Sequence, residues 1–144
     1  MINKLRVRAQ SESGFTLVEL LVVMLILGLL AAIAIPAFFN QRDKAADAEA
    51  KSTAKTTQTA METYATDNNG KYTGATVALL QAIEPTIPSS GVALDPAPSD
   101  TGYSIDVSST VAGQTFSIDR TAGALSYPCT ASGKGGCPVG GWGG

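Results

Sequence analysis

Residues 14–39 of this 144-residue chain read GFTLVELLVVMLILGLLAAIAIPAFF, and no charged residue occurs within 20–39. At a rise of about 1.5 Å per residue, roughly 20 helical residues cross the ~30 Å hydrocarbon core of a bilayer. The stretch therefore predicts a membrane-spanning helix over residues 15–39. Glu19 is its single carboxylate. A carboxylate at the bilayer centre costs about 2.5–3.5 kcal/mol even on lenient insertion scales, so this residue requires an explanation.

The segment before the apolar stretch, residues 1–14, is polar and basic and carries Lys4, Arg6 and Arg8. It is typical of a targeting segment, which is excluded from the fold, and the positive-inside rule places this end in the cytoplasm. An ordinary secretory signal peptide is the alternative, with a small-residue cleavage site at 32–34. Such a peptide needs no carboxylate in its apolar region, so Glu19 disfavours it.

Residues 14–19, Gly-Phe-Thr-Leu-Val-Glu, match position by position the N-terminal motif of type IV prepilins, a family that this chain resembles over its first third. The resemblance implies that a prepilin peptidase cuts between Gly14 and Phe15 and that the new amine of Phe15 is N-methylated. It also implies that Glu19 recruits and aligns subunits by pairing with a neighbour's terminal amine. Opposite charges attract strongly in a low-dielectric bundle, and each relieves the desolvation cost of the other. For an isolated helix, a tolerated acid near the headgroups is the simpler interpretation.

Gly28 and Pro36 interrupt an otherwise good helical sequence. Pro36 removes a backbone donor and disturbs the preceding turn, and glycine costs up to ~1 kcal/mol relative to alanine in a helix. Both residues are also common in ordinary membrane helices. The functional hypothesis is that residues 28–36 loosen outside the bilayer and give an assembled polymer some extensibility.

Composition and charge exclude several classes of function. The formal net charge is −2, and loss of residues 1–14, with three basic and one acidic side chain, would make it −4. A mildly acidic protein is poorly matched to nucleic acid, so direct binding is not expected, although a filament could take part in DNA uptake indirectly. The chain has no histidine, the usual general base and commonest zinc ligand. Since no nucleophile–base pair, metal cluster or phosphate loop is recognisable, we expect no catalytic residue, cofactor or metal.

The sequence pattern of residues 40–66 predicts that the helix continues in water as an amphipathic segment. Small and apolar side chains recur at spacings of three and four, which gives a narrow face suited to packing under a sheet. That face comprises Ala46, Ala50, Ala54, Thr57, Met61 and Tyr64. Asp47 and Lys51 are spaced for a favourable i,i+4 pair, and the other charges are interpreted as a solvated face. Gly70 is expected to end the helix in a left-handed cap or turn.

The segment 67–102 is interpreted as an exposed connection containing a short helix over residues 76–83. Asp95 and Asp100 could belong to a calcium-binding loop, but their spacing matches no compact oxygen-ligand pattern. The better interpretation is that these two acids solvate an exposed loop. Residues 103–127 alternate apolar and polar side chains in three short runs separated by turn residues, which predicts a three-stranded antiparallel meander. Its apolar face should pack on the helix around residues 54–64.

The C-terminal segment, residues 128–144, is rich in glycine and contains both cysteines, Cys129 and Cys137. In an exported chain they are expected to form a disulfide, because a two-cysteine metal site would lack its other ligands. The loop resembles the exposed surface-binding loop of many pilins. Lys134 at its tip and Trp142 in the tail are candidate exposed groups for adhesion, and a structural clip with a floppy end is the simpler alternative.

The predicted fold is α+β, with one long N-terminal helix and a small three-stranded antiparallel sheet packed on the C-terminal half of that helix. The exported domain is expected over residues 40–144 and includes that half of the helix and the sheet. The resemblance implies a structural subunit of a type IV pilus, which assembles with copies of itself. Its expected partners are a prepilin peptidase, an assembly ATPase and a membrane platform. The precursor would sit in the cytoplasmic membrane and the polymer on the cell surface. The alternative is the major pseudopilin of a type II secretion system, which the cysteine pair and the missing calcium loop disfavour.

Overall fold

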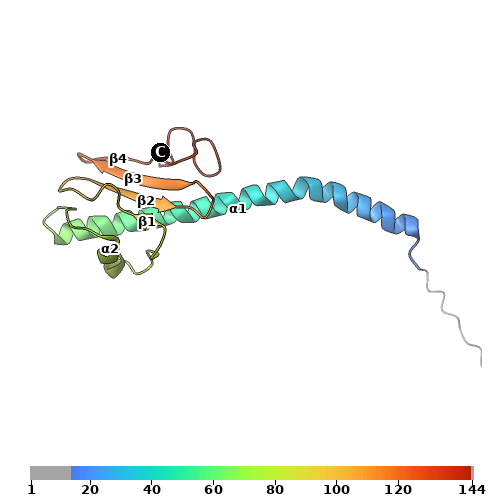
Figure 1. Ribbon diagram of the computed structural model, residues 1–144, viewed down its shortest axis with the longest axis horizontal. Helices are drawn as coiled ribbons and strands as arrows, with labels where there is room; N and C mark the ends of the chain where they lie inside the picture. The colour runs from blue at the N-terminus through green and yellow to red at the C-terminus, as the bar shows by residue number, and fades with distance from the viewer. Residues whose placement is uncertain (1–13, 144) are drawn as a thin grey trace, which may run out of the picture. The chain divides into compact units, whose positions relative to one another are not determined.

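The computed structural model describes residues 14–143, so the expected leader, apart from Gly14, lies outside the described residues, and with it Lys4, Arg6 and Arg8. The chain is α+β, as predicted (Figure 1). Its elements are α1 Leu17–Asp67, α2 Val77–Ile83, β1 Val92–Ala93, β2 Tyr103–Ser108, β3 Thr115–Thr121 and β4 Ala124–Ser126. Two compact units divide between Ala37 and Phe38, within α1.

The first unit contains the apolar half of α1. It runs without a break through Gly28 and Pro36, and its apolar side chains from Leu17 onward are exposed. By length and composition it is the one helix in residues 14–143 that could cross a membrane. The loosening of residues 28–36 therefore stays a prediction for the assembled state, because the isolated chain holds this stretch as a helix.

The second unit is built on the small-residue face of α1. The sequence predicted this face well: Ala50, Ala54 and Met61 are buried, whereas Ala46 and Tyr64 are only half-buried. Small side chains let the sheet approach the helix backbone closely and fill the space with its own larger side chains. The helix ends at Asp67, and the amide of Gly70 donates to the carbonyl of Ala65 at 2.7 Å with a left-handed φ of 79°, as expected for the cap.

The sheet has four antiparallel strands in the order β1-β2-β3-β4 (Figure 1), so the prediction of three strands was wrong in number. The additional strand comes from the connecting segment, where Val92 pairs with Val107 of β2. A two-residue edge strand flanked by glycine and proline carries too little alternation to be recognised in the sequence.

The apolar face of β2 and β3 forms the core against α1. Ile105 lies opposite Ile118, and Val107 lies opposite Phe116, and all four side chains are buried. The third predicted run behaves differently, because β4 is an exposed edge strand in which Leu125 is 40% exposed. The predicted meander of residues 103–127 is thus correct in order, while its last strand contributes little to the core.

Candidate functional site

The backbone at the expected cleavage junction is irregular and exposed. Gly14, Phe15 and Thr16 precede the first helical residue, and the Phe15 side chain is 82% exposed. An exposed segment outside regular secondary structure is accessible to a protease. Cleavage between Gly14 and Phe15 and methylation of Phe15 remain predictions that suit this local structure.

Thr16 and Glu19 form a reciprocal cap at the start of α1. The Glu19 carboxylate accepts from the backbone amide of Thr16 at 2.8 Å and from its hydroxyl at 2.9 Å. The amide of Glu19 in turn donates to the Thr16 hydroxyl at 3.2 Å. This is a capping box, with Thr-x-x-Glu as its sequence signature. This capping box was not predicted from the sequence, although its signature is present in residues 16–19.

The cap gives Glu19 a local role that needs no second subunit. In the isolated chain the carboxylate is satisfied by its own helix start, and it is exposed. Pairing with a neighbour's amine would therefore have to compete with, or add to, these hydrogen bonds. Substitutions at Glu19 alone cannot separate the two roles unless they preserve the cap.

The first unit exposes a continuous apolar surface. The side chains of Leu17, Leu20, Met24 and Ile33 are each more than half exposed, and the same holds for most of the apolar residues between them. A soluble monomer seldom exposes an apolar patch of this extent, and burying it in lipid or against other helices is strongly favourable. The surface thus requires a membrane or a bundle of like helices.

Asp47 is a buried acid that connects parts of the second unit far apart in the sequence. The sequence predicted only an i,i+4 pair with Lys51 for this residue. Asp47 has no exposed surface. Its Oδ1 accepts from the Ser109 hydroxyl and its Oδ2 from the Gly136 amide, both at 2.7 Å. Lys51, the expected partner of Asp47, instead places its Nζ 5.1 Å from the ring centroid of Phe116. Asp47 therefore links α1 to the end of β2 and to the C-terminal loop.

The C-terminal loop is closed by the predicted disulfide between Cys129 and Cys137. The backbone of this loop approaches α1 so closely that a side chain would not fit: a Cβ on Gly136 would lie 2.7 Å from the Cβ of Asp47. Lys134 is exposed at the tip, as expected. The loop is therefore fixed to the body of the domain on one side and open on the other.

Trp142 corrects the expectation of a floppy, exposed tail. Its indole is half-buried and packs edge-on against Phe116 and Tyr127, with ring centroids 5.9 and 5.4 Å apart. Its Nε1 is within 3.1 Å of the carbonyl oxygens of Ser117 and Pro128, to which it donates. A tryptophan engaged in this way anchors the tail to the sheet and is a poor candidate for adhesion.

A second polar cluster surrounds Glu62 at the other end of the sheet. The carboxylate accepts from the hydroxyls of Tyr72 and Tyr103, both at 2.8 Å, and from Arg120 at 3.1 Å. Burial, together with the hydrogen bond to Glu62, raises the pKa of Tyr103 above its usual value. The cluster fixes the beginning of β2 and the end of β3 to α1.

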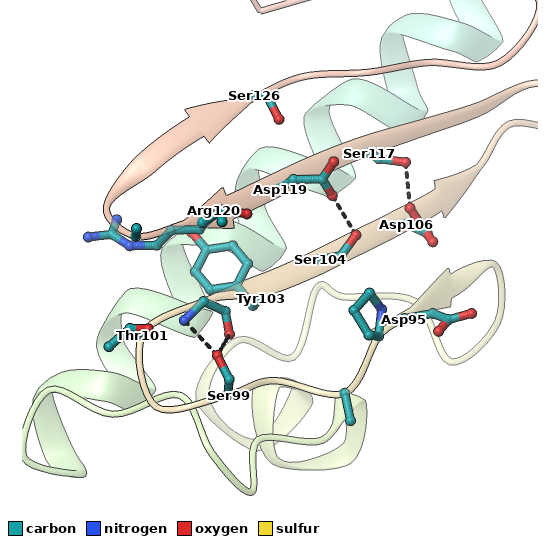
Figure 2. A pocket seen from close by; sticks show the side chains of 15 residues that line it. Asp95, Ser99, Thr101, Tyr103, Ser104, Asp106, Ser117, Asp119, Arg120 and Ser126 are labelled. Atoms are coloured by element: carbon teal, nitrogen blue, oxygen red, sulfur yellow. Dashed lines mark hydrogen bonds between the residues drawn. The ribbon is translucent and has the colours of Figure 1, made fainter.

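Figure 2 shows a groove on the outer side of the sheet, lined by β2, β3 and the loop 95–102. The Ser104 hydroxyl donates to Asp119 at 2.5 Å, and Ser117 donates to Asp106. Asp95 lies at the same groove.

Asp100 points elsewhere and accepts from Lys71 at 2.7 Å and from Thr73 at 2.5 Å, which lowers its pKa. No group of three or more potential metal-ligating side chains occurs within residues 14–143.

Comparison with known proteins identifies the N-terminal segment. Residues 10–35 match the family of the prokaryotic N-terminal methylation motif. The type II secretion system core protein G of Klebsiella michiganensis is 36% identical over 56% of this chain and 57% of its own length. The type IV major pilin protein PilA of Myxococcus xanthus is 45% identical over 35% of this chain and 23% of its own length.

The similarity to a third relative covers a larger part of the chain. The fimbrial protein EcpC of Eikenella corrodens is 29% identical over 85% of both chains. By contrast, the chain spans only 41–57% of the length of core protein G from Klebsiella, Pseudomonas and Aeromonas. No solved structure matches the chain. The similarity to the fimbrial protein, at 85% of the chain, therefore includes most of the second unit.

Proposed function

We propose that this type IV pilin-like chain is the structural subunit of a type IV pilus. The observation that carries the proposal is the combination of the methylation motif over residues 10–35 with an apolar helical segment in which no side chain is buried. A membrane can cover this helix before assembly, and like helices can cover it in the core of a fibre. The chain has a structural role in this proposal and no catalytic one.

Assembly would begin with processing by a prepilin peptidase. Cleavage after Gly14 leaves a cationic amine on Phe15, four residues before Glu19, and N-methylation keeps that amine charged. In a fibre core the Glu19 carboxylate of one subunit then pairs with the amine of another, because neither charge can find water there. An assembly ATPase and a membrane platform would supply the work of extracting the helix from lipid.

The second candidate is the major pseudopilin of a type II secretion system. It is favoured by the relatives named core protein G, three of which share 36–41% identity over 40–56% of this chain. The pilus is favoured by the fimbrial relative, whose similarity covers 85% of the chain. Electron microscopy distinguishes the two: long surface fibres indicate a pilus, and short periplasmic structures indicate a pseudopilus.

The central experiment replaces Glu19 with glutamine in the full chain. Glutamine can still serve in a capping box, so Glu19→Gln removes the charge while the helix start is preserved. We expect this variant to be processed normally and to yield no assembled filament. The measurements are the mature N-terminal mass and its methylation, and the quantity of subunit in sheared or periplasmic filaments.

Thr16→Val is the matched control. It removes the capping hydroxyl and keeps the Glu19 charge, so we expect assembly to persist. If the glutamine variant assembles as well as the unmodified chain while the valine variant does not, Glu19 acts through its cap and the charge-pairing proposal is wrong. An unprocessed N-terminus in the unmodified chain would contradict the proposed function itself.

A further inference from the structure

The second unit carries two surfaces of opposite charge. The acidic groove is the groove of Figure 2, with the carboxylates of Asp95, Asp106 and Asp119. The basic groove lies between the start of the exported part of α1 and the disulfide loop and includes Lys44 and Lys134. Each groove encloses about 600 Å³, enough to receive several side chains of a partner.

The carboxylates of the acidic groove form no ion pair within residues 14–143, although one cation, Arg120, also lines the groove. Asp106 and Asp119 each accept one serine hydroxyl, which orients the carboxylate and leaves its charge unpaired. The adjacent Arg120 donates to Glu62. The other ion pair among residues 14–143 joins Lys71 to Asp100, so neither pair includes a carboxylate of this groove.

The lysine charges of the basic groove are likewise not paired with a carboxylate within residues 14–143. Lys44 and Lys134 take part in neither of those two ion pairs, and among the described residues Asp43 is the only acid that lines the groove. Gln114, which also lines the groove, is only 5% exposed, and its Nε2 donates to the carbonyl of Lys134 at 3.0 Å. Its Oε1 is buried and has no hydrogen-bond partner within residues 14–143. A buried acceptor without a partner is uncommon in native proteins.

The two grooves lie toward opposite ends of the sheet. Asp119 is next to Arg120, which contacts Glu62 of α1, whereas the disulfide loop contacts Asp47. At about 1.5 Å per residue these two positions on α1 are roughly 22 Å apart. The two grooves have no lining residue in common and are therefore separate surfaces of the second unit.

From these observations we infer that the acidic groove of one subunit receives the rim of the basic groove, with Lys44 and Lys134, of the next copy of this chain in the filament. The inference rests on the proposed function. Different patches on the two partners make the contact heterologous, and a heterologous contact that does not close generates an open helical polymer. The charges set the register and partner choice between the globular domains, while the apolar helices supply most of the attraction.

A carbodiimide tests the contact in filaments of the unmodified chain, because this reagent joins a carboxylate directly to an amine only when the two touch. Filaments are assembled from light and ¹⁵N-labelled subunits, cross-linked and analysed by mass spectrometry. We expect mixed-label links from Lys134 or Lys44 to Asp95, Asp106 or Asp119, and a ladder of multimers on a denaturing gel. Filaments that contain no such link would overturn the inference and leave the proposed function standing. Failure of the unmodified chain to assemble at all would overturn both.

Charge reversal provides the second measurement. We expect Lys134→Glu and Asp119→Lys each to lower filament yield at least threefold, and the double variant to recover most of the yield. Asp119→Asn keeps an acceptor for Ser104 and should give an intermediate yield. Asp67→Lys reverses an exposed acid outside both grooves and should have no effect. Equal yields from all these variants would overturn the inference.

Discussion

Removal of the Asp47 side chain should destabilise the second unit far more than its place in a charged helical segment suggests. In Asp47→Ala, the Ser109 hydroxyl and the Gly136 amide both lose a charged acceptor at 2.7 Å. A hydrogen bond to a charged group contributes about 1.5–3 kcal/mol, which gives about 3–6 kcal/mol for the two. Gly136 is half-exposed, so water can replace part of the loss. We therefore expect a decrease of about 2–4 kcal/mol in the free energy of unfolding.

The assay is urea unfolding of the full chain in detergent, followed by the fluorescence of Trp142. This is the only tryptophan, and it packs on the sheet beside Phe116, so its emission reports the second unit directly. Glu49→Ala, at an exposed position on the same helix, is the control and should change the free energy by less than about 0.5 kcal/mol. An Asp47→Ala variant as stable as this control would refute the assignment of Asp47 as the link between α1 and the C-terminal loop.

Three further changes test the packing of the second unit. Gly136→Ala places a Cβ 2.7 Å from the Cβ of Asp47, so we expect a loss of about 1–3 kcal/mol in the same urea assay. Cys137→Ser opens a loop with a sequence separation of 8, and we expect a loss of about 2–3 kcal/mol, matched by adding a reductant to the unmodified chain. Because the pKa of Tyr103 is raised above its unfolded value of 10.0, the contribution of Tyr103 to stability should be constant below pH 10 and fall as the pH rises further. Tyr103→Phe should reduce this alkaline decline and cost about 1 kcal/mol near neutral pH through the lost hydrogen bond to Glu62.

The features that the sequence predicted are those encoded by local patterns. Twenty uncharged residues identify the spanning helix, a spacing of three and four identifies the packed face of α1, and alternation identifies β2 and β3. The left-handed turn at Gly70 and the disulfide follow from residue type alone. Each of these signals lies within a few residues of the structure that it specifies, which is why single-sequence reasoning found them.

The roles of Asp47 and Trp142 lacked such a signal because their partners are distant in the chain. Asp47 is 62 residues from Ser109 and 89 from Gly136, so its sequence neighbours gave no indication of its burial. Trp142 follows a run of glycines, and only the folded sheet brings Phe116 and Tyr127 to its ring. Both residues fix the glycine-rich loop, which has no apolar run of its own. A loop without intrinsic structure can present Lys134 in a defined place only if the body of the domain holds it, and that is what Asp47, Trp142 and the disulfide together achieve.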